Sequence, residues 1–213
     1  MIYQIDKEER DYRLESYDYL LDPSLIASKP SAIRHESRLM IVRNSVLEED
    51  CLTNKFTKNL LDEFREGDLV VVNNTKVMKA RLKVELENKT LVELLVLERS
   101  HECVWLCLAK PAKKLKINIK LKLKSHLAED INLIVDGVDE ETGGRLIKFP
   151  ENITCLNSMN DLLDKYGEIP LPPYIKNSEE ESFHEKSYQT EYATNPGAVA
   201  AQTAGLHLSK SLI

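Results

Sequence analysis

The sequence has few of the features that mark membrane and secreted proteins. No apolar stretch reaches the roughly 18 residues that a bilayer-spanning helix needs. The opening residues, MIYQIDKEERDYRLES, contain no apolar signal core. The 213 residues include only four cysteines, which are scattered rather than clustered. These absences favour a cytoplasmic protein with no membrane partner and with reduced thiols.

Motifs for metals and nucleotide cofactors are also absent. Cys103 and Cys107 form a C-x3-C pair, but no second pair completes a set of ligands. Structural zinc needs about four ligands, so we expect no metal. Neither G-x-x-x-x-G-K-[ST] nor G-x-G-x-x-G occurs, which argues against a bound nucleotide cofactor.

The composition is that of a globular protein. Apolar residues make up 42% of the chain and charged residues 30%, with a formal net charge of -6. This length allows one large domain or two small ones. The negative charge argues against a wholly basic surface for nucleic acid, but it leaves room for a local basic patch.

The pattern along the chain predicts an α/β domain with an inserted small antiparallel β-barrel. Between residues 80 and 150, short β-like runs follow one another, separated by turns such as ENKT and ETGG. We expect the first part of the α/β domain in residues 1–76, the barrel in 77–150 and an incomplete second part of the α/β domain in 151–213.

Four elements are expected outside the barrel. Residues 38–42 are typical of a strand. Residues 56–68 have helical spacing, with Gly67 as a C-cap. The apolar run 68–74 predicts a buried strand, and MNDLLDKYG (159–167) predicts a further helix.

Three motifs each allow a structural and a functional interpretation. Asn73 and Asn74 follow a predicted strand, where they form a turn or hold a ligand. The extended GEIPLPPYI (167–175) is a packed loop or presents Tyr174 at a fixed place. Small residues crowd PGAVAAQTAGLH (196–207), whose His207 is a structural residue or a general base.

A lysine-rich stretch, KPAKKLKINIKLKLK (110–124), predicts a strand with one cationic face. Lys120, Lys122 and Lys124 alternate with Leu121 and Leu123. Such a face protects a sheet edge from pairing, or it contacts phosphates without reading sequence. Both interpretations remain open at this stage.

Taken together and in order, several of these motifs resemble one family, the S-adenosylmethionine:tRNA ribosyltransferase-isomerases of queuosine biosynthesis. The resemblance covers nearly the whole chain. It rests on DPSLIASKP (22–30), RHESRLMIV (34–42), EGDLVVVNNTKVMKARL (66–82), GEIPLPPYI (167–175), YQTEYA (188–193) and PGAVAAQTAGLH (196–207).

The resemblance implies a reaction and its partners. The ribosyl part of S-adenosylmethionine moves onto 7-aminomethyl-7-deazaguanine in the anticodon loop of a tRNA, and it isomerises to give epoxyqueuosine. S-adenosylmethionine is then a consumed substrate, and no cofactor is expected. The resemblance also implies a fold that pairs an α/β domain with an inserted β-barrel.

Candidate residues follow from the resemblance and the chemistry. His207, Tyr174 and Thr203 are the candidate catalytic residues, and Arg34 and Arg38 are candidates for the methionine carboxylate or a phosphate. Other candidates for substrate binding are Asn73, Asn74, Gln189, Thr190 and Gly205. The candidate tRNA contacts are Lys113, Lys114, Lys120, Lys122 and Lys124.

The resemblance also implies a longer protein, because the family continues for more than a hundred residues beyond AGLH. We therefore expect a C-terminally truncated member, a monomer unless a separate chain complements it. Two alternatives remain: a catalytically inactive tRNA-binding fragment and a decayed gene product.

Overall fold

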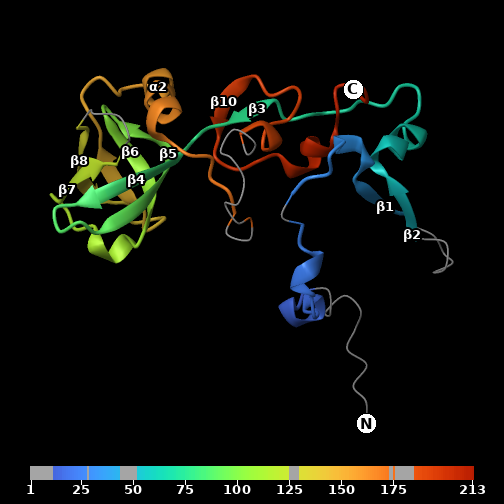
Figure 1. Cartoon of the computed structure of the whole chain (residues 1–213), viewed down its shortest axis with the longest axis horizontal. Helices are drawn as coiled ribbons and strands as arrows, with labels where there is room; N and C mark the ends of the chain where they lie inside the picture. The colour runs from blue at the N-terminus through green and yellow to red at the C-terminus, as the bar shows by residue number, and fades with distance from the viewer. Residues whose placement is uncertain (1–11, 28, 44–51, 125–129, 173–174, 176–184) are drawn as a thin grey trace, which may run out of the picture.

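Three separate β-sheets lie in a row along the long axis of the molecule (Figure 1). The structure is a computed structural model, and it describes residues 12–27, 29–43, 52–124, 130–172, 175 and 185–213. At one end is a closed six-stranded barrel, in the middle a parallel strand pair, and beyond it an antiparallel pair. The helices in these ranges are all too short or too polar to cross a bilayer.

The structure confirms the predicted antiparallel β-barrel. Its strands follow the order β4-β5-β6-β9-β8-β7, and every neighbouring pair is antiparallel. The strands are β4 (Arg81–Leu86), β5 (Leu91–His101), β6 (Val104–Lys110), β7 (Lys120–Leu123), β8 (Asn132–Val138) and β9 (Arg145–Lys148). Closure leaves no free sheet edge in this part of the chain.

Apolar side chains at alternate positions of the strands fill the barrel interior. Leu82 and Val84 of β4 are buried, as are Val92, Leu94 and Val96 of β5, and the residues between them are less buried. A strand turns successive side chains to opposite faces, so each strand supplies one apolar row to the core. Helix α2 (Leu156–Tyr166), where the sequence predicts a helix, packs onto the same core through three buried residues, Met159, Leu162 and Leu163.

The two strand pairs outside the barrel are short. Strand β1 (Arg38–Val42) has the predicted bounds and pairs antiparallel with β2 (Leu52–Phe56). Strand β3 (Thr75–Val77) pairs parallel with β10 (Asn195–Ala198). Six 3-10 helices complete the described elements: η1 (Leu14–Tyr17), η2 (Pro23–Leu25), η3 (Arg34–Glu36), η5 (Thr57–Glu63), η6 (Ala112–Lys114) and η7 (Thr203–His207).

Two local predictions are wrong. The helix expected over 56–68 is the shorter 3-10 helix η5, because β2 extends to Phe56 and occupies its start. The buried strand expected over 68–74 is neither a strand nor buried. The apolar run favours a strand, but no described segment forms a backbone hydrogen bond with residues 69–72 or buries them. The division into domains and the α/β arrangement remain predictions.

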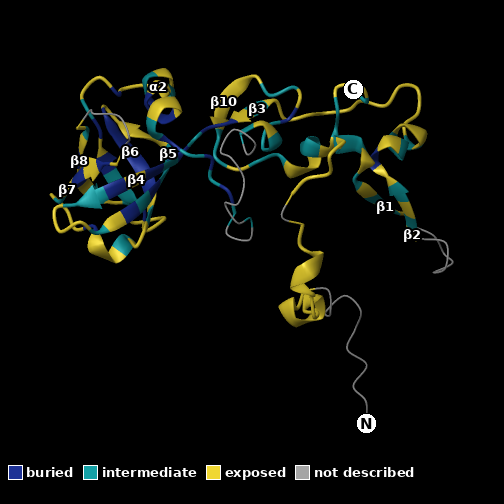
Figure 2. Cartoon of the chain, viewed as in Figure 1, coloured by how far each residue is buried: buried dark blue, intermediate teal, exposed yellow. Residues whose placement is uncertain are grey.

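The buried apolar core lies entirely in the later part of the described chain. Its first member is Val77, whereas residues 12–72 contribute one buried residue, the polar Thr57, within their described ranges. Figure 2 shows the contrast, with buried residues concentrated in the barrel and exposed ones along the N-terminal segments. The barrel therefore has a sealed core, and the segments before β3 have none.

This contrast predicts how single leucines in β5 contribute to stability. Leu94→Ala removes a fully buried side chain (0% exposed) and should lower the free energy of unfolding by about 2–5 kcal/mol. The control Leu91→Ala, in the same strand but 50% exposed, should change it by less than about 1 kcal/mol. Urea unfolding followed by tryptophan fluorescence measures both, and equal losses would contradict a sealed barrel core.

Candidate functional site

A cavity of about 410 Å³ lies where the N-terminal and C-terminal segments of the described chain meet. Its walls are formed by residues 27, 29–32, 34 and 37, by residues 175, 187 and 188, and by η7. Three predicted site residues, Arg34, Thr203 and His207, line this cavity. The structure therefore brings together residues that are about 170 positions apart in the sequence.

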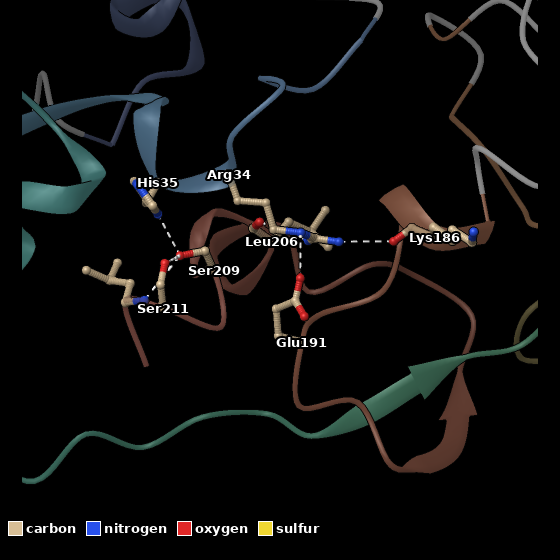
Figure 3. Close-up of polar contacts among 8 residues, drawn as sticks. Arg34, His35, Lys186, Glu191, Leu206, Ser209 and Ser211 are labelled. Carbon is tan, nitrogen blue, oxygen red and sulfur yellow. Dashed lines mark hydrogen bonds and ion pairs between the residues drawn. The ribbon is translucent and has the colours of Figure 1, made fainter.

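Arg34 joins the two walls of this cavity. Its Nη1 donates to the Leu206 carbonyl and its Nη2 to the Lys186 carbonyl, both at 3.0 Å. Its Nε lies 3.2 Å from the Glu191 carboxylate (Figure 3). All three guanidinium nitrogens thus contact protein acceptors, and the planar fork of arginine suits this arrangement. In this structure Arg34 positions η7 and the segment around residues 186–191.

His207 is held by a short chain of hydroxyl groups. Its Nδ1 lies 2.9 Å from Ser37 Oγ, which in turn lies 2.9 Å from Thr57 Oγ1. Ser37 Oγ also lies 3.0 Å from the Arg34 carbonyl, to which it can donate. Because Ser37 engages Nδ1, Nε2 is the ring nitrogen suited to exchange a proton with a ligand. His207 itself is exposed to solvent.

Ser37 is a site residue that sequence reasoning missed. It lies within RHESRLMIV, one of the motifs that suggested the family, yet a serine next to a strand gives no periodic signal. A second tie of the same kind joins His35 Nδ1 to Ser209 Oγ at 2.6 Å (Figure 3). Both contacts fix the segment around η7 against η3.

A second cavity, of about 610 Å³, shares Arg34 with the first. Gln189 and Thr190, both predicted to bind substrate, line it. The Gln189 side chain accepts from Val77 N at 2.9 Å and donates to Val77 O at 2.8 Å. It therefore pairs with β3 as a strand backbone would, and its part in substrate binding stays a prediction.

Thr190 and Gly205 pack against each other. Thr190 is only 5% exposed, and its hydroxyl has no hydrogen-bond partner among the described residues. A Cβ at position 205 would lie 2.9 Å from Thr190 Cγ2 and would overlap the Tyr192 hydroxyl. Because Gly205 has no side chain, Thr190 and Tyr192 can approach its backbone closely, as the many small residues in this motif suggested.

Asn73 and Asn74 form a turn, which is the structural interpretation of that motif. Asn73 Oδ1 accepts from Thr75 N at 2.9 Å and lies 2.6 Å from Thr75 Oγ1. The Asn74 carbonyl accepts from Thr194 N at 2.9 Å and so connects the turn to the residues before β10. Neither asparagine lines the two cavities.

Other predicted residues lie apart from the cavities. Arg38 is exposed on β1 and lines neither of them. Tyr174 lies outside the described residues. The five candidate lysines are all exposed on the barrel: Lys113, Lys114, Lys120, Lys122 and Lys124.

The cationic face of β7 is confirmed, because lysines point outward while Leu121 and Leu123 are buried. Acidic groups partly neutralise it. Lys122 Nζ lies 2.6 Å from Asp130 Oδ1, and Lys122 pairs across the sheet with Glu85.

The described cysteines do not form a metal site. Cys103 and Cys107 are buried and Cys155 is exposed, all as free thiols. Burial raises the pKa of the Cys107 thiol, which keeps it protonated and unreactive. Hydrogen bonds from Ser158 lower the pKa of Cys155. Within the described ranges, no three Cys, His, Asp or Glu side chains cluster as metal ligands would.

Comparison with known proteins gives the family. A family model described as "Queuosine biosynthesis protein" matches residues 14–213. The chain belongs to this family. The resemblance inferred from the motifs is thereby confirmed.

Two curated relatives of this chain carry the name S-adenosylmethionine:tRNA ribosyltransferase-isomerase. The one from Prochlorococcus marinus strain MIT 9301 is 93% identical over all 213 residues, which cover 57% of its own length. The one from Synechococcus sp. strain CC9311 is 44% identical over 206 residues, 97% of this chain and 55% of that protein. The chain thus spans little more than half the length of the curated relatives it matches.

A solved structure also matches, the S-adenosylmethionine tRNA ribosyltransferase of Thermotoga maritima. It is 28% identical, and the match covers 81% of this chain and 55% of that one. The TM-score is 0.33, so the arrangements of the two chains agree too little for a comparison of their sites.

The role of Arg34 can be tested without any ligand. Arg34→Lys keeps the charge but loses the planar fork, so η7 should lose its tie to the Lys186–Glu191 segment. We expect the backbone amides of residues 203–208 to exchange with deuterium about 10-fold faster or more. The control Arg38→Lys, on the exposed face of β1, should leave these exchange rates unchanged. Unchanged rates in Arg34→Lys would contradict the proposed positioning of η7 by Arg34.

Proposed function

We propose that this queuosine biosynthesis protein transfers the ribosyl moiety of S-adenosylmethionine onto 7-aminomethyl-7-deazaguanine in tRNA and isomerises it, giving epoxyqueuosine. The observation that carries the proposal is the 93% identity, over every residue of this chain, with a relative that bears the ribosyltransferase-isomerase name. S-adenosylmethionine serves as a consumed substrate, and we propose that no further cofactor takes part.

The size of the cavity around His207 and two of the residues that line it support this proposal. About 410 Å³ lies within the range of small-molecule sites. The sulfonium of S-adenosylmethionine acidifies the neighbouring carbon, so a positioned base can remove its proton. His207, held through Nδ1 by Ser37, is our candidate for this base, and Thr203 lines the same cavity as a hydroxyl donor.

The remaining partners follow from the same proposal. The substrate base sits in a tRNA anticodon loop, where a nucleotide can be splayed into a pocket. We propose a cytoplasmic, monomeric protein with an α/β domain around the inserted barrel. Lysines on the barrel contact phosphates of the tRNA.

A product assay tests the activity and the role of His207. The purified chain is incubated with S-adenosylmethionine and tRNA that carries the deazaguanine precursor, and digested nucleosides are measured by mass spectrometry. Epoxyqueuosine should form, and His207→Ala should lower its rate at least about 100-fold. The control His101→Ala, on the barrel, should retain the rate.

Two results of this assay would contradict the proposal. If folded chain gives no product, the proposed activity does not reside in these residues alone. If His207→Ala turns over at a near-normal rate, His207 is not the base.

The tRNA contact of the barrel predicts a charge effect. Changing Lys120, Lys122 and Lys124 together to Glu should weaken tRNA binding at low salt. The slope of the logarithm of the binding constant against the logarithm of the salt concentration should become shallower by up to about 3. A matched control changes three other exposed lysines, Lys58, Lys148 and Lys165, to Glu, which alters the net charge equally. Filter binding across a salt series measures the tRNA affinity of both variants. Equal losses of affinity would mean that the net charge of the protein, and not these three lysines, causes the effect.

A further inference from the structure

Ser37 and Thr57 lie side by side because the β1–β2 pair continues one step beyond its strands. The register of the pair ends with Arg38 opposite Phe56, and Thr57 N then donates to the Ser37 carbonyl at 2.9 Å. The two hydroxyl oxygens also lie 2.9 Å apart. Thr57 is the one buried residue in the described part of 12–72. A buried polar side chain needs hydrogen-bond partners, and Thr57 finds them in Ser37.

The Ser37 hydroxyl has one hydrogen to donate and three neighbours. Besides Thr57, the Arg34 carbonyl lies 3.0 Å and His207 Nδ1 lies 2.9 Å from its oxygen. A hydroxyl donates once and accepts twice, so all three contacts are hydrogen bonds only if one neighbour accepts and two donate. A carbonyl can only accept. The Arg34 carbonyl therefore takes the Ser37 hydrogen, and Thr57 and His207 both donate to Ser37 Oγ.

The opposite arrangement leaves one contact without a hydrogen. If Nδ1 of His207 were unprotonated, it would compete with the Arg34 carbonyl for the single Ser37 hydrogen. The pair that lost would be two acceptors whose lone pairs face each other at 2.9 or 3.0 Å. The Arg34 carbonyl has another contact, from Ser37 N, but at 3.4 Å this bond is long. Only a hydrogen on Nδ1 satisfies every contact of Ser37 Oγ.

We propose that Ser37 is a positioning residue that keeps the ring proton of His207 on Nδ1, and that Thr57 holds Ser37 in place for this purpose. A neutral imidazole carries one ring proton, so Nε2 then has a free lone pair and can accept a proton. The proposal rests on the proposed function, in which His207 is the base. It deepens that function, because the other tautomer has no lone pair at Nε2.

Arg34 acts on both sides of this contact. Its carbonyl takes the Ser37 hydrogen and so sets the direction of the hydroxyl. Its guanidinium donates to the carbonyl of Leu206, the residue before His207. The same residue therefore orients the serine and holds the backbone that carries the histidine.

A spectrum of the His207 ring nitrogens tests the proposal without any ligand. The full chain is labelled with 15N in its histidine rings, and two-bond 1H–15N correlations are recorded at about pH 8.5, where imidazole rings are neutral. His207→Ala identifies the His207 signals by their loss. We expect the proton on Nδ1 in most molecules, whereas an unconstrained histidine in water favours Nε2. A His207 ring that carries its proton mainly on Nε2 would overturn the proposal.

Three variants test whether Ser37 is the cause. Ser37→Ala removes the acceptor, so the proton should move mainly to Nε2, while Ser37→Thr keeps a hydroxyl and should keep the proton on Nδ1. The control Ser100→Ala removes a hydroxyl that lies 3.1 Å from Nδ1 of His101 on the barrel, and it should leave the His207 signals unchanged. A Ser37→Ala chain that still carries the proton on Nδ1 would show that another group sets the tautomer.

Turnover provides a second measurement. Ser37→Ala should lower the rate of epoxyqueuosine formation about 10-fold or more. Added to His207→Ala, it should cause no further loss, because Ser37 acts through His207 and the two residues form one unit. Additive losses would overturn the proposal. If the chain gives no product, the proposed activity fails, but the spectrum still decides where the ring proton lies.

Discussion

The cavity around His207 depends on the guanidinium of Arg34. This one group bonds to the backbone beside His207, to the Lys186 carbonyl and to the Glu191 carboxylate. The segment that carries Arg34 adds no apolar core to this region, because the described residues 12–72 bury no apolar side chain. A small apolar cluster of Val77, Ile169 and Leu171, with Tyr188 and Ala198 packed against it, connects only the later segments. A net contribution of about 1 kcal/mol per hydrogen bond is modest. We therefore expect the site to lie in a less stable part of the molecule than the barrel.

The barrel, in contrast, is held together by apolar packing and by backbone pairing between its strands. Its strands close on themselves, and its interior is filled by alternating side chains of six strands and by α2. It needs no other part of the chain to satisfy its edges. The chain thus joins a self-sufficient scaffold to a region in which polar contacts position the candidate site while apolar surface stays exposed.

Local patterns predicted the barrel, β1 and α2, because a two-residue or helical repeat depends on neighbours in the sequence. The 68–74 segment shows the limit: its apolar run encodes a preference for burial, but burial needs a partner that the described chain does not contain. Gln189 shows another limit. Its contact with Val77 spans 112 positions and leaves no pattern in the sequence, so the sequence could not predict it.

The central claim is that the site region is held by polar contacts and opens separately from the barrel. Native-state hydrogen exchange in low concentrations of urea tests this most directly. We predict that amides of β4 and β5 exchange through global unfolding, whereas those of β1, β3 and η7 exchange through smaller openings that depend little on urea. A single opening free energy shared by all these elements would contradict the account.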